Sequence, residues 1–529
     1  MAKIKALILI LFLPASLIAQ QHFDVIIKNG KIVDGTGNPW FYGDLGIIKD
    51  KIVKIGDLSK SKADSVIDAT GLIVAPGFID VHTHIEDDEA KTPTADNFIY
   101  DGVTSVITGN CGSSKIDIKK YFDTLKLIKL SINVGTLIGH NDVREVVLGD
   151  ADVTPDPDQL KKMEAIVEQA MRDGAMGFST GLEYTPGIFS KTDEVIALAK
   201  SAAKYKGIYT SHMRNESDKI FEAIAETINI GRQANMPVEI SHFKVGKPNW
   251  NTSEKMIAMV DSARREGIDV TVDTYPYTAS STTLNILLPD WLKDGGSAAT
   301  LKRLSDTTQY EKAVNEMIAD MQRRQRDHFD YAVVASCEGD PAINGKSIEQ
   351  INIDSGRPST IPNEIKTILD IIRKGGAAMV FHSMNEDDVA NIIKYPHTMI
   401  ISDSGIRQFG VGMPHPRGYG SNARVLAYYV REKKLITLED AVRKMTSLPA
   451  QRFHITNRGL LQPGMYADIV IFDAGTVKDQ STFEHPHAYS TGFKYVFVNG
   501  AITVDNFKHN GTRKGAILHG PGYMQTQVK

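Results

Sequence analysis

The sequence predicts a TIM-like (β/α)8 barrel that carries a small β-sandwich built from both ends of the chain. In residues 76–455, short apolar strand-like runs alternate with helix-like stretches, the repeat that favours parallel strands joined by crossover helices. Residues 21–75 and 456–529 read mainly as short strands separated by glycines. A chain of 529 residues has room for one large domain with appendages. A doubly wound open sheet is the alternative for the middle segment.

The barrel segment offers nine strand candidates, one more than a closed barrel needs. Helix-like segments such as residues 160–172 and 219–234 separate several of them. The candidates are Phe78–Val81, Ser105–Thr108, Asn133–Ile138, Ala175–Phe178, Ile208–Ser211, Val238–Ser241, Val270–Asp273, Ala378–Phe381 and Met399–Ser402.

Residues from about 285 to about 375 break this rhythm, because they are charged, helical and long. We interpret them as an insertion between late barrel units, and hence as a candidate lid over the active site. Elaborated barrel helices are the alternative.

The composition describes an ordinary soluble globular protein, with 42% hydrophobic and 23% charged residues. A formal net charge of −4 and the lack of a long basic run give no reason to expect nucleic acid or an anionic membrane as partner. The small-molecule substrate that we expect rests on the candidate site residues. The sequence leaves the oligomeric state open.

The first twenty residues have the pattern of a secretory signal peptide. Lys3 and Lys5 precede an apolar run over residues 6–13, and small residues surround a cleavage position near Ala19 or Gln20. An N-terminal membrane anchor is the alternative, although the run is short for a span. We expect a periplasmic or secreted protein without stable membrane insertion after the signal is removed.

The most informative run extends from Ala75 to His84. Pro76-Gly77 forms a turn into the apolar strand Phe78–Val81, and the alternation of a strand places His82 and His84 on one face. Two such imidazoles can hold a divalent ion, although a pair of surface histidines is the alternative. The run resembles the first-strand signature of the amidohydrolase superfamily, whose members are metal-dependent hydrolases.

Further metal-capable side chains follow other predicted strands. His212, His242 and Asp403 each come directly after such a run, and Cys111 follows the run that ends at Thr108 by three residues. A parallel barrel brings the carboxyl ends of its strands together. Imidazoles, a thiolate and a carboxylate suit Zn²⁺, and the sulfur argues against magnesium or calcium. Zinc with an adjacent carboxylate, here Asp403, supports hydrolysis of an amide. A disulfide between Cys111 and Cys337 is a competing use of the cysteines.

Several longer motifs resemble the N-acyl-D-amino-acid deacylase (D-aminoacylase) family, from about residue 23 to past residue 500. The cysteine after the second barrel strand is the most specific part of this resemblance. The motifs are Gly109-Asn-Cys-Gly112, Ser179-Thr-Gly-Leu-Glu-Tyr-Thr-Pro-Gly187, Ser211-His-Met-Arg214, Glu239-Ile-Ser-His-Phe-Lys244, Asp273-Thr-Tyr-Pro-Tyr277 and Met413-Pro-His-Pro-Arg417.

The resemblance implies specific roles for these residues. It implies zinc-dependent release of a carboxylate and a free D-amino acid from N-acyl-D-amino acids, with Asp403 as the general acid and base. Cys111, His212 and His242 would form a tight zinc site, and His82, His84 and Asp403 a second, weaker or vacant one. The implied substrate contacts are Tyr184, Lys244, Ser281, Met384 and Arg417.

Two positions leave alternatives open. His140 stands in Gly139-His-Asn-Asp-Val-Arg144, where the family commonly carries Gly-His-Gly, and we expect it to be structural or to lie in the pocket. Glu183 is an alternative to Cys111 as a residue that bridges two metals.

Other functions compete with deacylation of N-acyl-D-amino acids. One is hydrolysis of a related amide, such as a dipeptide with a C-terminal D-residue or a cyclic amide of the dihydroorotase and hydantoinase type. The Cys111 motif and the lack of an evident bridging lysine disfavour the cyclic amides. The other is a non-catalytic binding protein on a degenerate barrel, which would have no need for Asp403.

Overall fold

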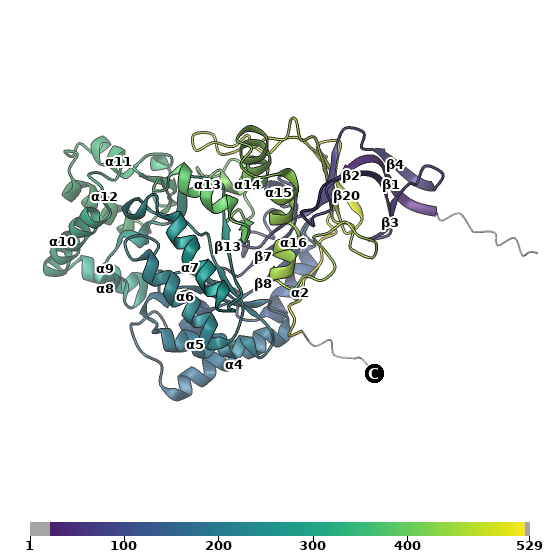
Figure 1. The fold of residues 1–529 in the computed structure, drawn as a ribbon. Coiled ribbons are helices and arrows are strands. Elements are labelled where there is room, and N and C mark those ends of the chain that lie inside the picture. The colour runs from purple at the N-terminus through teal and green to yellow at the C-terminus, as the bar shows by residue number, and fades with distance from the viewer. Residues whose placement is uncertain (1–21, 524–529) are drawn as a thin grey trace, which may run out of the picture.

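The computed structural model describes residues 22–523, which form three units arranged along the molecule (Figure 1). A β-rich unit lies at one end, the barrel occupies the middle, and an inserted α/β unit lies at the other end. The signal peptide predicted for residues 1–20 lies outside the described residues. Within residues 22–523, no helix is both long enough and apolar enough to cross a membrane.

Eight parallel strands form the central barrel. The third strand is interrupted at Leu137, so that β8 pairs with β7 and its continuation β9 pairs with β10. The last strand closes on the first, because the Asp403 amide donates to the His82 carbonyl at 3.0 Å. The strands are β6 (Phe78–Asp80), β7 (Val103–Thr108), β8 (Asn133–Thr136) with β9 (Ile138–Gly139), β10 (Gly177–Gly181), β11 (Ile208–His212), β12 (Val238–Ile240), β13 (Val270–Thr274) and β17 (Thr398–Ile400).

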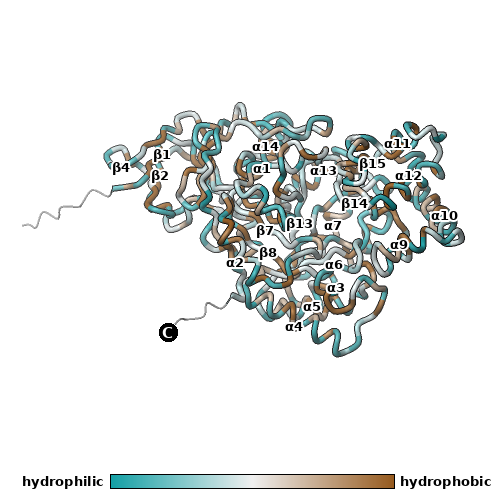
Figure 2. Tube along the Cα trace, turned by 180° about the vertical axis from the view of Figure 1, so that it is seen from behind, coloured by the Kyte–Doolittle hydropathy of each residue, from teal (hydrophilic) through white to brown (hydrophobic). Residues whose placement is uncertain are grey.

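Amphipathic helices surround these strands, and Figure 2 shows hydrophobic and hydrophilic segments alternating along them. Helix α4 shows how the sequence sets such a helix. Asp156 and Gln159 form a capping box, Pro157 begins the helix, and Gly174 ends it in the left-handed conformation. The helices are α1 (Asp96–Ile99), α2 (Ile118–Ile128), α3 (His140–Leu148), α4 (Pro157–Asp173), α5 (Thr192–Ala203), α6 (Ile220–Ala234), α7 (Ser253–Arg265), α13 (Glu386–Lys394), α14 (Arg417–Arg424), the π-helical η5 (Val425–Glu432), α15 (Leu438–Met445) and α16 (Ser447–Arg452). Short 3-10 turns are η1 (Gly187–Phe189) and η2 (Lys247–Asn249).

The β-rich unit is a nine-stranded sheet built from both ends of the chain. Strands β5 and β18 join the two halves, with Ala75 opposite Val470 in an antiparallel pair. Hydrogen bonding joins all nine strands into one sheet. The N-terminal and C-terminal strands of the predicted sandwich therefore do not form separate sheets. The strands are β1 (His22–Ile32), β2 (Phe41–Ile48), β3 (Lys51–Gly56), β4 (Lys62–Asp68), β5 (Ile73–Pro76), β18 (Ile469–Phe472), β19 (Phe493–Val498), β20 (Ala501–Asp505) and β21 (Lys508–His509).

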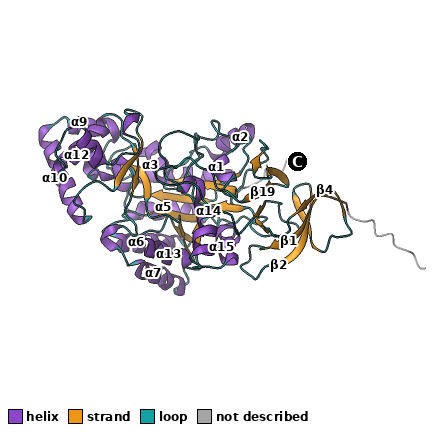
Figure 3. Cartoon of the chain, turned by 90° about the horizontal axis from the view of Figure 1, so that it is seen from above, coloured by secondary structure: helices purple, strands orange, loops and turns teal. Residues whose placement is uncertain are grey.

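The inserted unit lies between β13 and β17 and has its own hydrophobic core. Its antiparallel sheet and helices extend away from the barrel (Figure 3). The prediction of Ala378–Phe381 as a barrel strand is wrong, because this strand pairs antiparallel with β14 and β15. The elements are β14 (Ser280–Thr283), η3 (Leu284–Leu287), α8 (Asp290–Lys293), α9 (Gly296–Leu304), α10 (Thr307–Arg323), β15 (Ala332–Ser336), η4 (Pro341–Ile343), α11 (Ile348–Asp354), α12 (Ile361–Arg373) and β16 (Ala378–Phe381).

Candidate metal centre and substrate pocket

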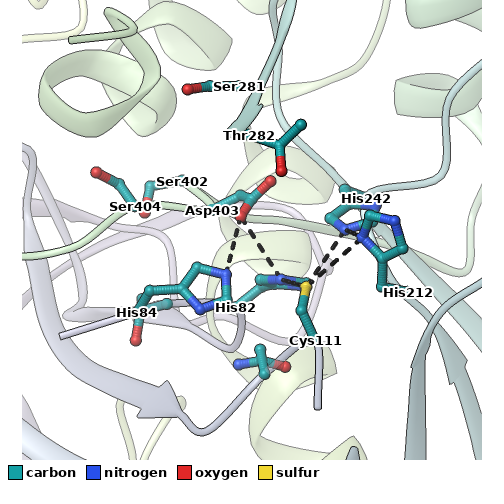
Figure 4. A network of polar contacts seen from close by, with 12 residues as sticks. His82, His84, Cys111, His212, His242, Ser281, Thr282, Ser402, Asp403 and Ser404 are labelled. Atoms are coloured by element: carbon teal, nitrogen blue, oxygen red, sulfur yellow. Dashed lines mark hydrogen bonds and ion pairs between the residues drawn. The ribbon is translucent and has the colours of Figure 1, made fainter. Parts of the chain in front are cut away.

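Cys111, His212 and His242 converge at the carboxyl ends of three barrel strands (Figure 4). The Cys111 Sγ lies 3.8 Å from His212 Nδ1 and 3.5 Å from His242 Nε2, and these two nitrogens are 2.9 Å apart. Ligands bonded to a tetrahedral zinc at about 2.0–2.3 Å lie roughly 3.3–3.8 Å from one another. The three side chains therefore fit a shared zinc ion after a small shift of the histidine rings.

A second group adjoins the first. His84 Nε2 lies 3.2 Å and His82 Nε2 lies 3.6 Å from Asp403 Oδ1, and His82 Nε2 also lies 3.2 Å from the sulfur of Cys111 (Figure 4). The second oxygen of Asp403 is paired with Arg417 at 2.8 Å. The structure thus brings all six predicted ligands together, with Cys111 between the two groups.

Tight turns hold the ligands at the strand ends. Cys111, His242 and Asp403 have positive φ angles of 52°, 34° and 49°, a region that costs a non-glycine residue free energy. Around Cys111 the chain packs so closely that a Cβ on Gly181 would come within 2.0 Å of the Cys111 carbonyl oxygen. Asn110 fixes the same turn by donating to the carbonyls of Val81 and Ile107 at 3.1 and 3.0 Å.

Three carboxylates orient the histidines from outside the cluster. Asp273 lies 3.3 Å from His82 Nδ1, and its other oxygen accepts the backbone amide of His242. Glu183 lies 3.1 Å from His212 Nε2 and Glu216 lies 3.0 Å from His242 Nδ1. Each carboxylate thus lies beside the ring nitrogen that points away from the metal position.

Glu183 does not take the bridging position that the sequence left open for it. It contacts His212 Nε2, whereas Nδ1 of the same ring faces the sulfur of Cys111. The carboxylate of Glu183 therefore lies on the far side of the imidazole from the candidate zinc position.

Burial and neighbouring charges shift the pKa of three side chains of the centre. Burial raises the pKa of the Cys111 thiol well above its usual range, with help from the negative charges of Asp403 and Glu216. It also lowers the pKa of His242 well below its usual range, which keeps the imidazole neutral. Burial would raise the pKa of Asp403 as well, but the guanidinium of Arg417, together with the neighbouring His82 and a hydrogen bond from His84, outweighs it, so that this carboxyl has a pKa well below its usual range.

The predicted substrate contacts all line one cavity of about 750 Å³ above the metal residues. The barrel and the inserted sheet both contribute to its wall. The predicted residues are Tyr184, Lys244, Ser281, Met384 and Arg417.

Both predicted cations already have carboxylate partners. Lys244 forms a close ion pair with Glu216, and Arg417 pairs with Asp403. Within residues 22–523, however, the buried Nε of Arg417 has no hydrogen-bond partner.

Sequence reasoning missed several residues of the pocket. Tyr275 lines the cavity and its buried hydroxyl has no hydrogen-bond partner among the described residues. Thr282 donates a hydrogen bond of 2.9 Å to the hydroxyl of Tyr184. Tyr275 stands in a motif noted in the sequence, and Asp273 ends a predicted strand, so both carried a signal. Glu216 lies in a loop after β11 and carried none.

One residue that was considered for the site is structural, and the disulfide alternative fails. His140 lies 2.9 Å from Glu194, which also pairs with Arg144, and all three are buried away from the cavity. Cys111 and Cys337 are both free and buried, so the disulfide alternative is wrong.

Comparisons with known proteins agree with this geometry. The model of the amidohydrolase family matches residues 65–504. The D-aminoacylase of Alcaligenes xylosoxydans xylosoxydans is 32% identical over 522 residues, covering 94% of this chain and 98% of that protein. The N-acyl-D-glutamate deacylase of the same organism is 34% identical over 91% of this chain and 93% of its own length.

Solved structures extend the similarity to three dimensions. The N-acyl-D-glutamate deacylase of Bordetella bronchiseptica, in complex with zinc and a phosphonate that mimics the tetrahedral intermediate, is 33% identical with a TM-score of 0.81. It is matched over 94% of this chain and 100% of that one. A D-aminoacylase described as having a binuclear metal centre is 32% identical with a TM-score of 0.80, over the same shares. A D-hydantoinase, 17% identical with a TM-score of 0.55, shares the fold alone. The chain therefore belongs to the amidohydrolase family and, within it, to the N-acyl-D-amino-acid deacylases (D-aminoacylases).

Proposed function

We propose that this protein is a zinc-dependent hydrolase of N-acyl-D-amino acids that releases a carboxylate and a free D-amino acid. The convergence of Cys111, His212 and His242 beside Asp403, at the base of a substrate-sized cavity, is the observation that carries this proposal. The similarity to D-aminoacylases supports the choice of substrate.

The chemistry of the ligand atoms indicates which metal ion the centre would hold. Cys111, His212 and His242 would hold a tightly bound zinc, and His82, His84 and Asp403 would hold a second, weaker one. When bound, zinc polarises a carbonyl and lowers the pKa of water toward neutrality. Zinc in the Bordetella enzyme and the binuclear centre of the D-aminoacylase support this assignment.

The side chains of the pocket supply the remaining chemistry. Asp403 is ionised at neutral pH, so it can accept the proton of the attacking water and deliver it to the leaving nitrogen. The buried hydroxyl of Tyr275 has no hydrogen-bond partner within residues 22–523 and can donate to the oxygen on which negative charge develops. Its pKa is raised by burial, so it keeps the proton it needs for this role.

The substrate carboxylate is assigned to the cationic side of the pocket. The Nε of Arg417 has no hydrogen-bond partner in the described part of the chain, and Lys244 lines the same cavity. Tyr184, Ser281 and Met384 complete the contacts with the remainder of the amino acid.

A panel of paired D and L N-acetyl amino acids tests this proposal. Acetate release would be measured with metal-depleted protein and with added zinc, and a hydantoin and a D-dipeptide would be included. We expect hydrolysis of D members only, restored by zinc. Turnover of the hydantoin or the dipeptide in preference to every N-acetyl-D-amino acid would overturn the assignment.

We further propose that the enzyme works in the periplasm or outside the cell. The support is the signal-peptide pattern of residues 1–20, with Lys3 and Lys5 before an apolar run. Fractionation of an expressing bacterium, with N-terminal sequencing of the mature protein, is expected to find the protein outside the cytoplasm, beginning near residue 20 or 21. An uncleaved protein in the cytoplasmic fraction would contradict this location.

A further inference from the structure

We propose that Glu216 is a positioning residue that selects the zinc-binding tautomer of His242 against competition from Lys244. This inference rests on the zinc site of the proposed function, but it concerns a residue outside the six predicted ligands. The contacts of the two ring nitrogens of His242 support this inference.

The Nε2 atom of His242 faces the candidate zinc position, since it lies 3.5 Å from Cys111 Sγ and 2.9 Å from His212 Nδ1. The opposite nitrogen, Nδ1, has two neighbours of contrary character. Glu216 Oε1 is 3.0 Å away and can only accept a hydrogen bond while it is ionised, whereas the ammonium of Lys244 is 2.8 Å away and can only donate one.

A neutral imidazole carries one proton, so the two neighbours favour different tautomers. With the proton on Nδ1, His242 donates to Glu216 and Nε2 keeps the lone pair that binds a metal. With the proton on Nε2, Nδ1 accepts from Lys244 and the metal-facing nitrogen is blocked.

Glu216 favours the first tautomer in two ways. One oxygen lies 3.0 Å from His242 Nδ1, where its negative charge favours a proton on that nitrogen, and the other forms a close ion pair with Lys244, which draws the ammonium toward the carboxylate. The side chains of His242 and Glu216 are only 3% and 8% exposed, so bulk water is not at hand to replace the carboxylate. Removal of Glu216 should leave Lys244 as the partner of Nδ1 and lower the affinity for zinc.

The test is a double-mutant cycle on the full-length protein, read as zinc affinity by competition with a chromophoric chelator. E216Q is expected to lower the affinity about 10–100-fold, the usual effect of losing such an orienting carboxylate. E194Q is the matched control, because Glu194 also accepts from a buried histidine, His140, but away from the metal residues. Its affinity should stay within about twofold of the wild type.

The competition with Lys244 gives a second readout that a merely structural role would not move. K244M should raise zinc affinity at least about threefold more in the E216Q background than in the wild type, because only there does Lys244 contact Nδ1 without competition from the carboxylate. Circular dichroism checks folding, and E216S takes the place of E216Q, with the same expected loss, if the amide variant does not fold.

Two results separate the inference from the proposed function. The role of Glu216 alone would be overturned if the wild-type protein binds zinc and the zinc affinity of E216Q stays within about twofold of it. It would also be overturned if K244M changes zinc affinity equally in both backgrounds. Wild-type protein that binds no zinc would overturn both.

Discussion

Three residues of the centre, Cys111, His242 and Asp403, have left-handed backbone conformations that L-residues seldom adopt. Each such residue costs about 1–3 kcal/mol and persists only where the surrounding contacts fix it. Here the contacts are buried hydrogen bonds, such as those of Asn110 around Cys111 and of Asp273 to the amide of His242. At the scale of single residues, the backbone therefore holds the ligands in place before any metal binds.

Asp403→Asn tests whether Asp403 acts chiefly as a proton carrier or as a metal ligand. The amide cannot shuttle a proton, so kcat should fall by at least about 100-fold. Zinc at the Cys111, His212 and His242 site should be nearly unchanged, because Asp403 is outside that set. Acetate release and zinc content measured on the same preparation check both. A loss of the tightly bound zinc would mean that Asp403 is chiefly a ligand.

At the scale of elements, the barrel strands deliver the ligands and the inserted unit completes the pocket. Strand β12 is only three residues long, yet it is buried and ends directly before the turn that carries His242. The inserted sheet contributes Ser281 and Thr282 to the cavity from β14. The chemistry thus depends on strand ends, while the shape of the cavity depends on a unit with a separate core.

A polar cluster links the helices of the inserted unit. His328, just before β15, lies 2.8 Å from Glu364 of α12 and 3.5 Å from Glu349 of α11. Ser359 donates to Glu349 at 2.7 Å. These three titratable groups are close enough to be considered for a metal, but His328 Nδ1 and Glu364 Oε1 already share a hydrogen bond of 2.8 Å.

His328→Gln is expected to destabilise the protein more at pH 5.5 than at pH 9. The hydrogen bond with Glu364 raises the pKa of His328 above its unfolded value. Its contribution is therefore complete below the unfolded pKa of about 6.5 and is lost as the pH rises through the folded value. The effect should be no more than about 1 kcal/mol, because the histidine is exposed to solvent.

Thermal unfolding of the wild type and the variant at both pH values measures this dependence. The difference between the two proteins should shrink as the pH rises. A difference that grows with pH would contradict the ion pair between His328 and Glu364.

At the scale of the whole molecule, a buried polar joint connects the β-rich unit to the barrel. Asp468, next to β18, forms a close ion pair with Arg458 and accepts from Asn133 at 3.1 Å. Asn499 in turn donates to Asn133 at 2.8 Å. Because Asn133 begins its barrel strand, this joint lies at the end of the barrel opposite the metal residues.

Arg458→Met should lower the free energy of unfolding by about 3–5 kcal/mol, because it leaves the buried Asp468 carboxylate without its cation. Zinc content should not change, since the joint is remote from the ligands. Chemical unfolding and metal analysis of the same samples measure the two quantities. A folded variant that has lost zinc would show that the β-rich unit supports the site directly.

Much of the architecture was predictable from the sequence, because the barrel repeat and the strand-rich ends carry strong periodic signals. The six ligand candidates followed from one rule, that polar side chains after parallel strands meet at one end of a barrel. Ala378–Phe381 was misplaced because a four-residue apolar run does not specify its partner strand. The partners of Glu216, Lys244 and Arg417 were beyond prediction, since they depend on how loops pack in three dimensions.

X-ray absorption at the zinc edge tests the central claim most directly, on full-length protein loaded with one equivalent of zinc. The account predicts one sulfur ligand at about 2.3 Å together with nitrogen ligands at about 2.0–2.1 Å. Cys111→Ser should remove the sulfur contribution. Zinc surrounded only by nitrogen and oxygen in the wild-type protein would contradict the account.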